Sequence, residues 1–167
     1  MGLIFVDCEA YGNAPEVGQL TEFGMVDYDM FDTFHGIIIP SKPSKENPAI
    51  PERTTLNSAA IDRVSKEVYE NCYKWLLLHK SKGSWVFVSD NVAFDWQWIN
   101  HGFWKYFGSN PFGHSGRRIG DFYAGLQNDF HATQKWKRLR KTKHDHNPVH
   151  DALGNAEAFK RIMKGER

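Results

Sequence analysis

Carboxylates stand at three separate places along the chain, each beside an apolar or amphipathic segment. Asp7 and Glu9 close the apolar run of residues 3–8, and they project from one face because side chains alternate along a strand. Asp95 follows a second apolar run, and Asp151 opens the last amphipathic segment. Neighbouring carboxylates that leave water repel one another, and hard Mg²⁺ relieves this repulsion because it prefers oxygen ligands. These residue types therefore suit metal-assisted chemistry.

Each place also has an ordinary explanation. Acid pairs at strand ends are commonly solvated, and Asp95 is equally a surface acid beyond a helix cap at Asn91. Asp151 alone suits a helix start, where a negative charge complements the helix dipole. Surface histidines are common too, and three stand near Asp151: His144, His146 and His150. None of the three places decides between the two interpretations by itself.

Apolar periodicity predicts the elements that position these residues. The predicted strands are residues 3–8, 20–28, 33–39 and 85–89, with Ile119 in a further short strand, and the predicted helices are residues 65–80, 93–107, 121–128 and 151–164. Four prolines mark residues 40–51 as a loop. This order predicts an α/β fold with a mixed β-sheet flanked by helices, in a single domain of residues 1–167.

Charge and cysteine content narrow the classes of protein that the chain can belong to. The 21 lysines and arginines exceed the 20 acids by one, so any attraction for a polyanion must come from local clusters. Two cysteines, Cys8 and Cys72, argue against a disulfide framework or a cysteine zinc site, and we expect buried, reduced thiols. The N-terminus does not resemble a signal peptide, and no apolar run reaches the roughly 20 residues that span a bilayer. We therefore expect a soluble, cytoplasmic protein without membrane contact.

A basic run covers residues 135–143, with six cations and no acid. Such a run suits contact with the phosphates of a nucleic acid. A solvated, flexible loop or a contact between subunits explains the same composition. The cations that we expect to bind substrate are Lys137, Arg138, Arg140 and Lys141.

Three motifs follow one another in the order D-x-E, N-x₃-D and H-x₄-D. They are residues 5–9 (FVDCE), 91–95 (NVAFD) and 146–152 (HNPVHDA), the last followed by Ala156 and Glu157. Over most of its length the chain resembles the DEDDh family of 3′–5′ exonucleases, which includes proofreading exonuclease subunits, RNase T and oligoribonuclease. Residues 20–26 (LTEFGMV) look like the second strand of that family, with its glutamate and glycine.

The resemblance implies an RNase H-like fold and a metal-dependent exonuclease. It assigns two Mg²⁺ or Mn²⁺ ions to four carboxylates and makes His146 the general base; the carboxylates are Asp7, Glu9, Asp95 and Asp151. His150 has the wrong spacing for the base, and His144 lies too far upstream. The implied reaction is hydrolysis at the 3′ end of single-stranded nucleic acid, with release of 5′-mononucleotides and RNA slightly favoured over DNA.

The substrate contacts are expected from residues that adjoin the motifs. Asn91 belongs to the second motif, and Tyr11 and Phe94 are placed to stack on bases. Other aromatic residues near the second motif have helical spacing and are more often part of a core: Trp96, Trp98, Phe103 and Trp104. Two positions depart from the family pattern, since Ala10 replaces a frequent threonine and Pro148 replaces the usual alanine.

Two other functions are compatible with the same motifs. One is a nuclease for very short oligonucleotides, and the other is a catalytically silent module that binds nucleic acid. A full set of four acids and a histidine speaks against the silent module, which has no need of all five. Small exonucleases of this kind often pair, which makes a homodimer possible.

Overall fold

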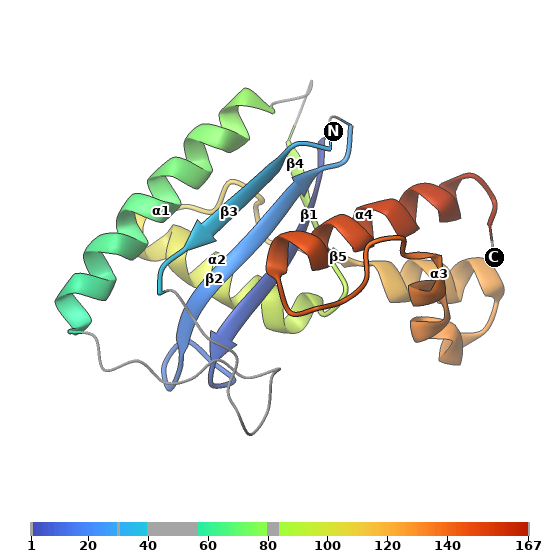
Figure 1. Cartoon of the computed structure of the whole chain (residues 1–167), viewed down its shortest axis with the longest axis horizontal. Helices are drawn as coiled ribbons and strands as arrows, with labels where there is room; N and C mark the ends of the chain where they lie inside the picture. The colour runs from blue at the N-terminus through green and yellow to red at the C-terminus, as the bar shows by residue number, and fades with distance from the viewer. Residues whose placement is uncertain (1, 30, 40–56, 80–83, 167) are drawn as a thin grey trace.

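The strand β1, Gly2–Tyr11, is the central strand of a five-stranded sheet, and both of its faces are largely buried (Figure 1). The computed structural model describes residues 2–29, 31–39, 57–79 and 84–166. The elements after β1 are β2 Gln19–Asp27, β3 Thr33–Ile37, α1 Ser58–Leu78, β4 Trp85–Ser89, α2 Val92–Phe107, β5 Gly116–Arg118, α3 Ile119–Gln127, the 3₁₀ helix η1 Phe130–Leu139 and α4 Pro148–Met163.

The sheet is mixed, as predicted. Its strand order is β3-β2-β1-β4-β5, with antiparallel pairing among β1, β2 and β3 and parallel pairing of β4 with β1 and β5. Because β1 and β4 are parallel, their carboxyl ends lie at one edge of the sheet. Residues that follow these two strands are therefore brought together.

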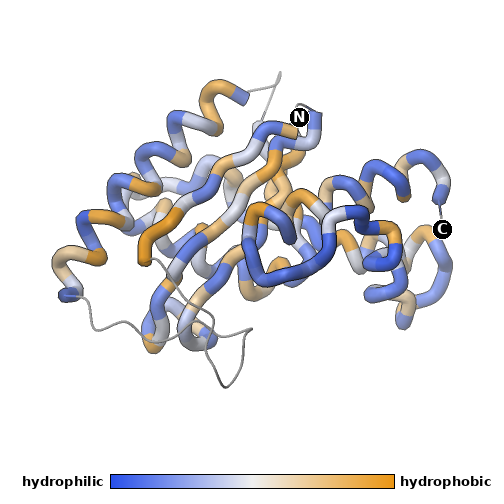
Figure 2. Tube along the Cα trace, viewed as in Figure 1, coloured by the Kyte–Doolittle hydropathy of each residue, from blue (hydrophilic) through white to orange (hydrophobic). Residues whose placement is uncertain are grey.

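Helices cover both faces of the sheet (Figure 1). The core on one face joins Ile4, Val6 and Cys8 of β1 to α1 and α2, and the core on the other face joins Phe5 to α3, η1 and α4. Asp7 and Glu9 lie on the same face of β1 as Phe5, so both project toward α4. Figure 2 shows apolar and polar residues alternating along the outer helices, as their half-buried positions require.

Several predicted bounds differ from the structure for local reasons. Helix α1 begins at Ser58 rather than Ser65, because the Asn57 side chain caps it by accepting a hydrogen bond from Ala59 N–H. Helix α4 begins at Pro148, which suits the first helical turn because it has no N–H to satisfy. Capping residues, rather than the apolar stripe, decide where these helices start.

The basic run is more structured than a flexible loop. Half of it lies in η1, where Trp136 is fully buried and Leu139 is nearly so. These two apolar side chains anchor the run to the core, and Lys137 and Arg138, which lie between them in sequence, are exposed. The predicted proline-rich loop, residues 40–51, falls outside the described residues.

Both cysteines, Cys8 and Cys72, are free and buried, as predicted. Among the aromatic residues near the second motif, Trp98 and Phe103 are core residues, whereas Trp104 is 48% exposed. Within the described part of the chain, no helix is long and apolar enough to span a membrane.

Gly24 of β2 lies close against the start of α4. A Cβ atom at this position meets the carbonyl carbon and oxygen of Pro148 at 2.3 Å, a distance that requires the backbone to shift. Replacing Gly24 by alanine is therefore expected to push the start of α4 away from β2 and to lower the free energy of unfolding by about 1–3 kcal/mol.

Chemical denaturation of Gly24→Ala measures this loss. The matched control is Gly125→Ala, because Gly125 lies in α3 with no atom within 4 Å of its Cβ position. That control is expected to gain up to about 1 kcal/mol from helix propensity. Equal stabilities of the two variants contradict the close-packing argument.

Candidate active site

Three of the four predicted carboxylates meet beside the central strand. Asp7 and Glu9 reach across from β1, and Asp151 reaches back from the first turn of α4. One oxygen of each lies within 4.8 Å of an oxygen of the other two. The three residues come from positions up to 144 apart in sequence (151 − 7).

The fourth carboxylate, Asp95, lies in the first turn of α2 and is 2% exposed. Its Oδ1 accepts a hydrogen bond from Cys8 N–H at 3.0 Å, and its Oδ2 accepts one from the Ser89 hydroxyl. These bonds tie the start of α2 to both β1 and β4. Ser89 supports Asp95 but was not predicted from the sequence. Its position as the last residue of β4, just before the second motif, is the feature that could have indicated it.

Helix α4 presents Asp151 through a well-capped first turn. Asn147 Oδ1 accepts hydrogen bonds from Val149 N–H at 3.0 Å and from His150 N–H at 3.3 Å. Asp151 is 1% exposed, and its Oδ1 accepts a hydrogen bond from Asp145 N–H at 3.3 Å. The capped turn therefore fixes the direction in which this buried carboxylate points.

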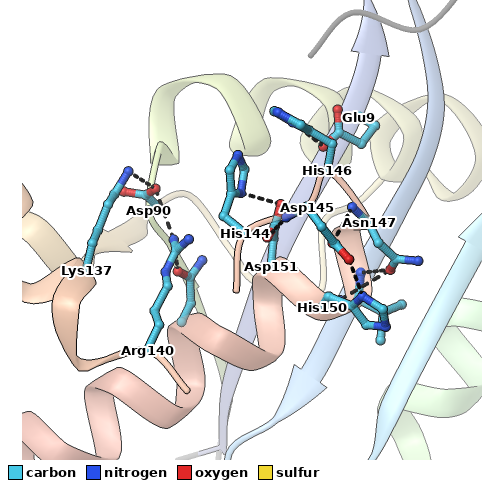
Figure 3. A network of polar contacts seen from close by, with 12 residues as sticks. Glu9, Asp90, Lys137, Arg140, His144, Asp145, His146, Asn147, His150 and Asp151 are labelled. Atoms are coloured by element: carbon cyan, nitrogen blue, oxygen red, sulfur yellow. Dashed lines mark hydrogen bonds and ion pairs between the residues drawn. The ribbon is translucent and has the colours of Figure 1, made fainter. Parts of the chain in front are cut away.

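The three neighbouring histidines point in different directions (Figure 3). His146 reaches Glu9, with 3.8 Å from Nδ1 to Oε1, and has a positive φ of 60°, an uncommon conformation that its surroundings must hold. His150 turns to the Asp145 carboxylate at 2.8 Å. His144, which the sequence set aside, lies 2.5 Å from Asp151 Oδ2 through its Nδ1.

A cleft of about 460 Å³ opens onto this group of side chains. Its lining includes the predicted residues Asn91, Phe94, Lys137 and His146, together with Asp7, Glu9 and Asp95. It also includes four residues outside the predicted site: Asp90, Arg118, Gln134 and His144. Tyr11, at the end of β1, is not among the described residues that line it.

Burial makes these carboxylates poor anions without a cation. Burial, then the charges of Asp95, Asp151 and Glu9, raise the pKa of Asp7 well above its usual value, while Arg140 acts in the opposite direction. Burial, followed by the charge of Asp151, raises the pKa of Glu9 to about 8. Burial raises the pKa of Asp95 to about 7, against the hydrogen bonds from Ser89 and Cys8, and it also raises the pKa of Asp151.

This donor set fits a divalent cation. Three carboxylates with oxygens within 4.8 Å of one another supply hard ligands, and a cation stabilises their ionised forms against burial and mutual repulsion. The arrangement is chemically costly unless it serves such an ion. The geometry thus agrees with metal-assisted hydrolysis.

Comparisons with known proteins point to one group of nucleases. No protein-family model matches the chain. It is 38% identical over 89 residues to the 3′-5′ DNA exonuclease Cap18 of Escherichia coli, a match that covers 47% of this chain and 45% of that protein.

Solved structures extend the likeness over nearly the whole chain. The nuclease domain of 3′hExo, a DEDDh family member bound to rAMP, superposes with a TM-score of 0.65 at 18% identity, over 98% of this chain and 92% of that domain. The resemblance to the DEDDh exonucleases is confirmed. Escherichia coli ExoI, in a zinc-bound complex with single-stranded DNA, matches with a TM-score of 0.53 at 13% identity, over 96% of this chain and 39% of ExoI. The predicted α/β, RNase H-like fold is that of the DEDDh nuclease domain.

The predicted basic contacts separate into two groups in this fold. Lys137 lines the cleft, where its Nζ lies 2.7 Å from Asp90 Oδ2. Arg138 is exposed, and its guanidinium donates hydrogen bonds to Lys135 O at 2.6 Å and to the Tyr123 hydroxyl at 3.3 Å. Lys141, which follows η1 in the run, is exposed. These three cations remain predicted substrate contacts.

Arg140 differs from these three cations because its side chain is only 8% exposed. Its Nη2 lies 3.3 Å from Asp90 Oδ2 and donates a hydrogen bond to Asn155 Oδ1, and its guanidinium stacks 5.1 Å from the centre of the Trp136 ring. Arg140 thereby joins the end of β4 to η1 and α4. These contacts indicate a structural role for Arg140, and its predicted contact with substrate stays a prediction.

Replacing Arg140 by alanine is expected to lower the free energy of unfolding by about 1.5–3 kcal/mol, because Asp90 and Asn155 lose a charged hydrogen-bond partner. Arg138→Ala is the matched control and is expected to change it by less than about 0.5 kcal/mol. Urea denaturation of both variants measures the difference. A stable Arg140→Ala protein with weaker oligonucleotide binding contradicts the structural role and supports the predicted contact with substrate.

The raised pKa values predict that the metal-free protein loses stability as the pH rises from about 4.5 to about 8. Glu9 keeps its proton in the folded protein over this range and loses it on unfolding, because its pKa moves from 4.5 to about 8. The folded state then binds more protons, so the free energy of unfolding falls by up to about 1.4 kcal/mol per pH unit for one retained proton. Asp95 adds to this fall in the free energy of unfolding between pH 3.8 and about pH 7, because its pKa is raised from 3.8 to about 7.

Thermal melting between pH 5 and pH 8, with EDTA or with Mg²⁺, measures this dependence. Mg²⁺ is expected to restore stability most strongly near pH 8, because it binds the ionised carboxylates and has fewer protons to displace as the pH rises. A melting temperature that is constant or rises with pH in EDTA contradicts the prediction.

Proposed function

We propose that the chain is a metal-dependent 3′–5′ exonuclease that hydrolyses single-stranded nucleic acid from its 3′ end and releases 5′-mononucleotides. The supporting observation is that oxygens of Asp7, Glu9 and Asp151 lie within 4.8 Å of one another, and that Asp7 and Glu9 line one cleft together with Asp95 and His146. The 3′-5′ exonuclease Cap18 shares 38% identity over part of the chain, which agrees with this reaction.

The proposed chemistry assigns one role to each side chain. Asp7, Glu9 and Asp151 bind the catalytic cations, and Asp95, held by Cys8 and Ser89, completes the set. Two Mg²⁺ or Mn²⁺ ions would make water a better nucleophile and stabilise the leaving oxygen. His146 accepts the proton of the attacking water, since imidazole exchanges protons readily near neutral pH. The new bond joins that oxygen to phosphorus, and the bond from phosphorus to the 3′ oxygen breaks.

The cleft also supplies contacts for a strand end. Phe94 is half-buried on its wall and is placed to stack on a base, and Asn91 offers an exposed amide beside it. Lys137 and Arg118 supply positive charge for phosphates. A single strand fits this arrangement better than a duplex, whose paired end must first open.

The choice between RNA and DNA stays a prediction, with RNA slightly favoured. The relatives point both ways, because Cap18 is a DNA exonuclease, 3′hExo was crystallised with rAMP and ExoI with single-stranded DNA. A homodimer and a cytoplasmic location also stay predictions. The nuclease for very short oligonucleotides remains the alternative within the same chemistry.

Digestion of labelled oligonucleotides tests the proposal. Single-stranded RNA and DNA, each labelled at the 5′ end or at the 3′ end, are incubated with Mg²⁺, Mn²⁺ or EDTA. Stepwise shortening of the 5′-labelled strand only with metal, and release of the 3′ label as a mononucleotide, is the expected result. Intact strands that nevertheless bind the protein favour the silent binding module.

A further inference from the structure

His144 is placed against the active site although no motif assigns it a role. It lies in the segment between η1 and α4, and its Nδ1 is 2.5 Å from Asp151 Oδ2 (Figure 3). Its ring centre lies 4.3 Å from that of His146. One nitrogen of each histidine and one oxygen of Asp151 all lie within 4.8 Å of one another.

The Asp151 oxygen in this group lacks a hydrogen bond. Asp151 is 1% exposed, its Oδ1 accepts from Asp145 N–H, and its Oδ2 accepts no hydrogen bond in the structure. The short contact with His144 has the distance of an ion pair but does not have the geometry of a hydrogen bond. A buried carboxylate oxygen in this state is poorly compensated, and a cation would satisfy it.

The backbone around His144 is held in place by the start of α4. Asp145 N–H donates to Asp151, and the Asp145 carboxylate accepts from Asn147 N–H at 3.0 Å and pairs with His150 at 2.8 Å. These contacts fix the residues on both sides of the His144–Asp151 approach. His144 therefore faces the site from an ordered turn, with half of its side chain open to solvent.

Two imidazole nitrogens and a carboxylate differ in chemistry from the carboxylate site next to them. Asp7, Glu9 and Asp151 offer only oxygen, which suits Mg²⁺. Imidazole is a preferred ligand of Zn²⁺, Ni²⁺ and similar ions, and three protein ligands with an open position are common for zinc. We propose that His144, His146 and Asp151 form a second cation site, which selects a divalent transition-metal ion such as Zn²⁺ or Co²⁺.

This site shares two residues with the proposed exonuclease centre, and its consequence for activity rests on that proposed function. A transition-metal ion on the His146 ring takes away the general base, and the same ion competes for Asp151. The two arrangements exclude each other. Transition-metal binding would therefore switch the proposed exonuclease off while Mg²⁺ is still present.

Binding of Co²⁺ to the full chain, with excess Mg²⁺ present, tests the site directly. Calorimetry gives the affinity, and proton NMR shows the strongly shifted ring N–H signals of histidines bound to Co²⁺. We expect two such signals in the unaltered protein. His144→Ala is expected to lose one signal and to bind Co²⁺ about tenfold more weakly or worse, with Mg²⁺ affinity changed less than about twofold.

Two further variants serve as controls. His114→Ala removes an exposed histidine outside the cleft and is expected to keep both signals. Asp151→Asn is expected to weaken both Co²⁺ and Mg²⁺, because Asp151 belongs to both sites. Circular dichroism melting establishes that each variant is folded.

The outcomes separate this inference from the proposed function. Co²⁺ binding that is unchanged or tighter in His144→Ala overturns the site, since a tighter value means that His144 competes with the ion for Asp151. Strand hydrolysis with Mg²⁺ but without a His144-dependent Co²⁺ site leaves the exonuclease and removes the inference. A His144-dependent Co²⁺ site in a protein that cuts no strand supports the inference and contradicts the proposed exonuclease.

Discussion

Replacing Asp7 by asparagine is expected to slow strand hydrolysis by about a thousandfold or more and, at the same time, to raise the melting temperature of the metal-free protein. The first effect follows from loss of a cation ligand, which is worth several kcal/mol in the transition state, with each 1.4 kcal/mol giving a factor of ten. Asparagine keeps the shape of the side chain and removes its charge.

The second effect follows from the charges that surround Asp7. Burial, together with Asp95, Asp151 and Glu9, disfavours its ionised form and raises its pKa. A neutral amide avoids that cost, so a gain in the folding stability of the metal-free protein is expected at pH 8. An acid whose removal stabilises the protein but abolishes activity is characteristic of a functional site.

Asp129→Asn is the matched control, because Asp129 is a surface acid with the opposite environment. Its salt bridge with Lys135 and the hydrogen bond from His131 N–H lower its pKa, so its loss is expected to destabilise the protein slightly and to leave hydrolysis unchanged. Melting with EDTA and initial rates with Mg²⁺ measure both effects. An Asp7→Asn protein that is less stable than the unaltered chain would show that Asp7 is a structural acid.

Replacing His146 by alanine is expected to lower the rate of hydrolysis by about 10²–10⁴-fold, the usual contribution of a general base. Stabilisation by Mg²⁺ is expected to persist, because Asp7, Glu9 and Asp151 remain. The variant thus separates proton transfer from cation binding. Initial rates across pH and the Mg²⁺-dependent rise in melting temperature provide the two readouts.

His150→Ala is the control for this second prediction. His150 is four residues away and pairs with Asp145 rather than with the carboxylates, so its loss is expected to cost less than about tenfold. If the two variants lose activity equally, the base has been assigned wrongly. If His146→Ala also loses the response to Mg²⁺, its main role is that of a ligand.

Much of the site was predictable because it depends on local rules. Strand alternation places Asp7 and Glu9 on one face, and the structure has both of them directed toward α4. The parallel pairing of β1 and β4 brings Asp95 to the same edge. Helix-start chemistry at Asn147 and Pro148 places Asp151 one turn into α4. Strand alternation and helix-start chemistry act over a few residues, so the sequence alone determined the candidate acids. The pairing of β1 with β4 joins Gly2 to Trp85 and is a tertiary contact.

Tertiary structure decided the features that depend on contacts between distant or irregular segments. Arg140 stands in a basic run that is typical of a protein surface, but its contact with Trp136 and its pairing with Asp90 bury its side chain. His144 has no periodic position, and only the turn before α4 brings it to Asp151. The need for glycine at position 24 is explained only by the Pro148 backbone, which leaves no room for a Cβ atom. Loop paths and helix-to-sheet distances are set by the packing of the whole core, and no spacing rule encodes them.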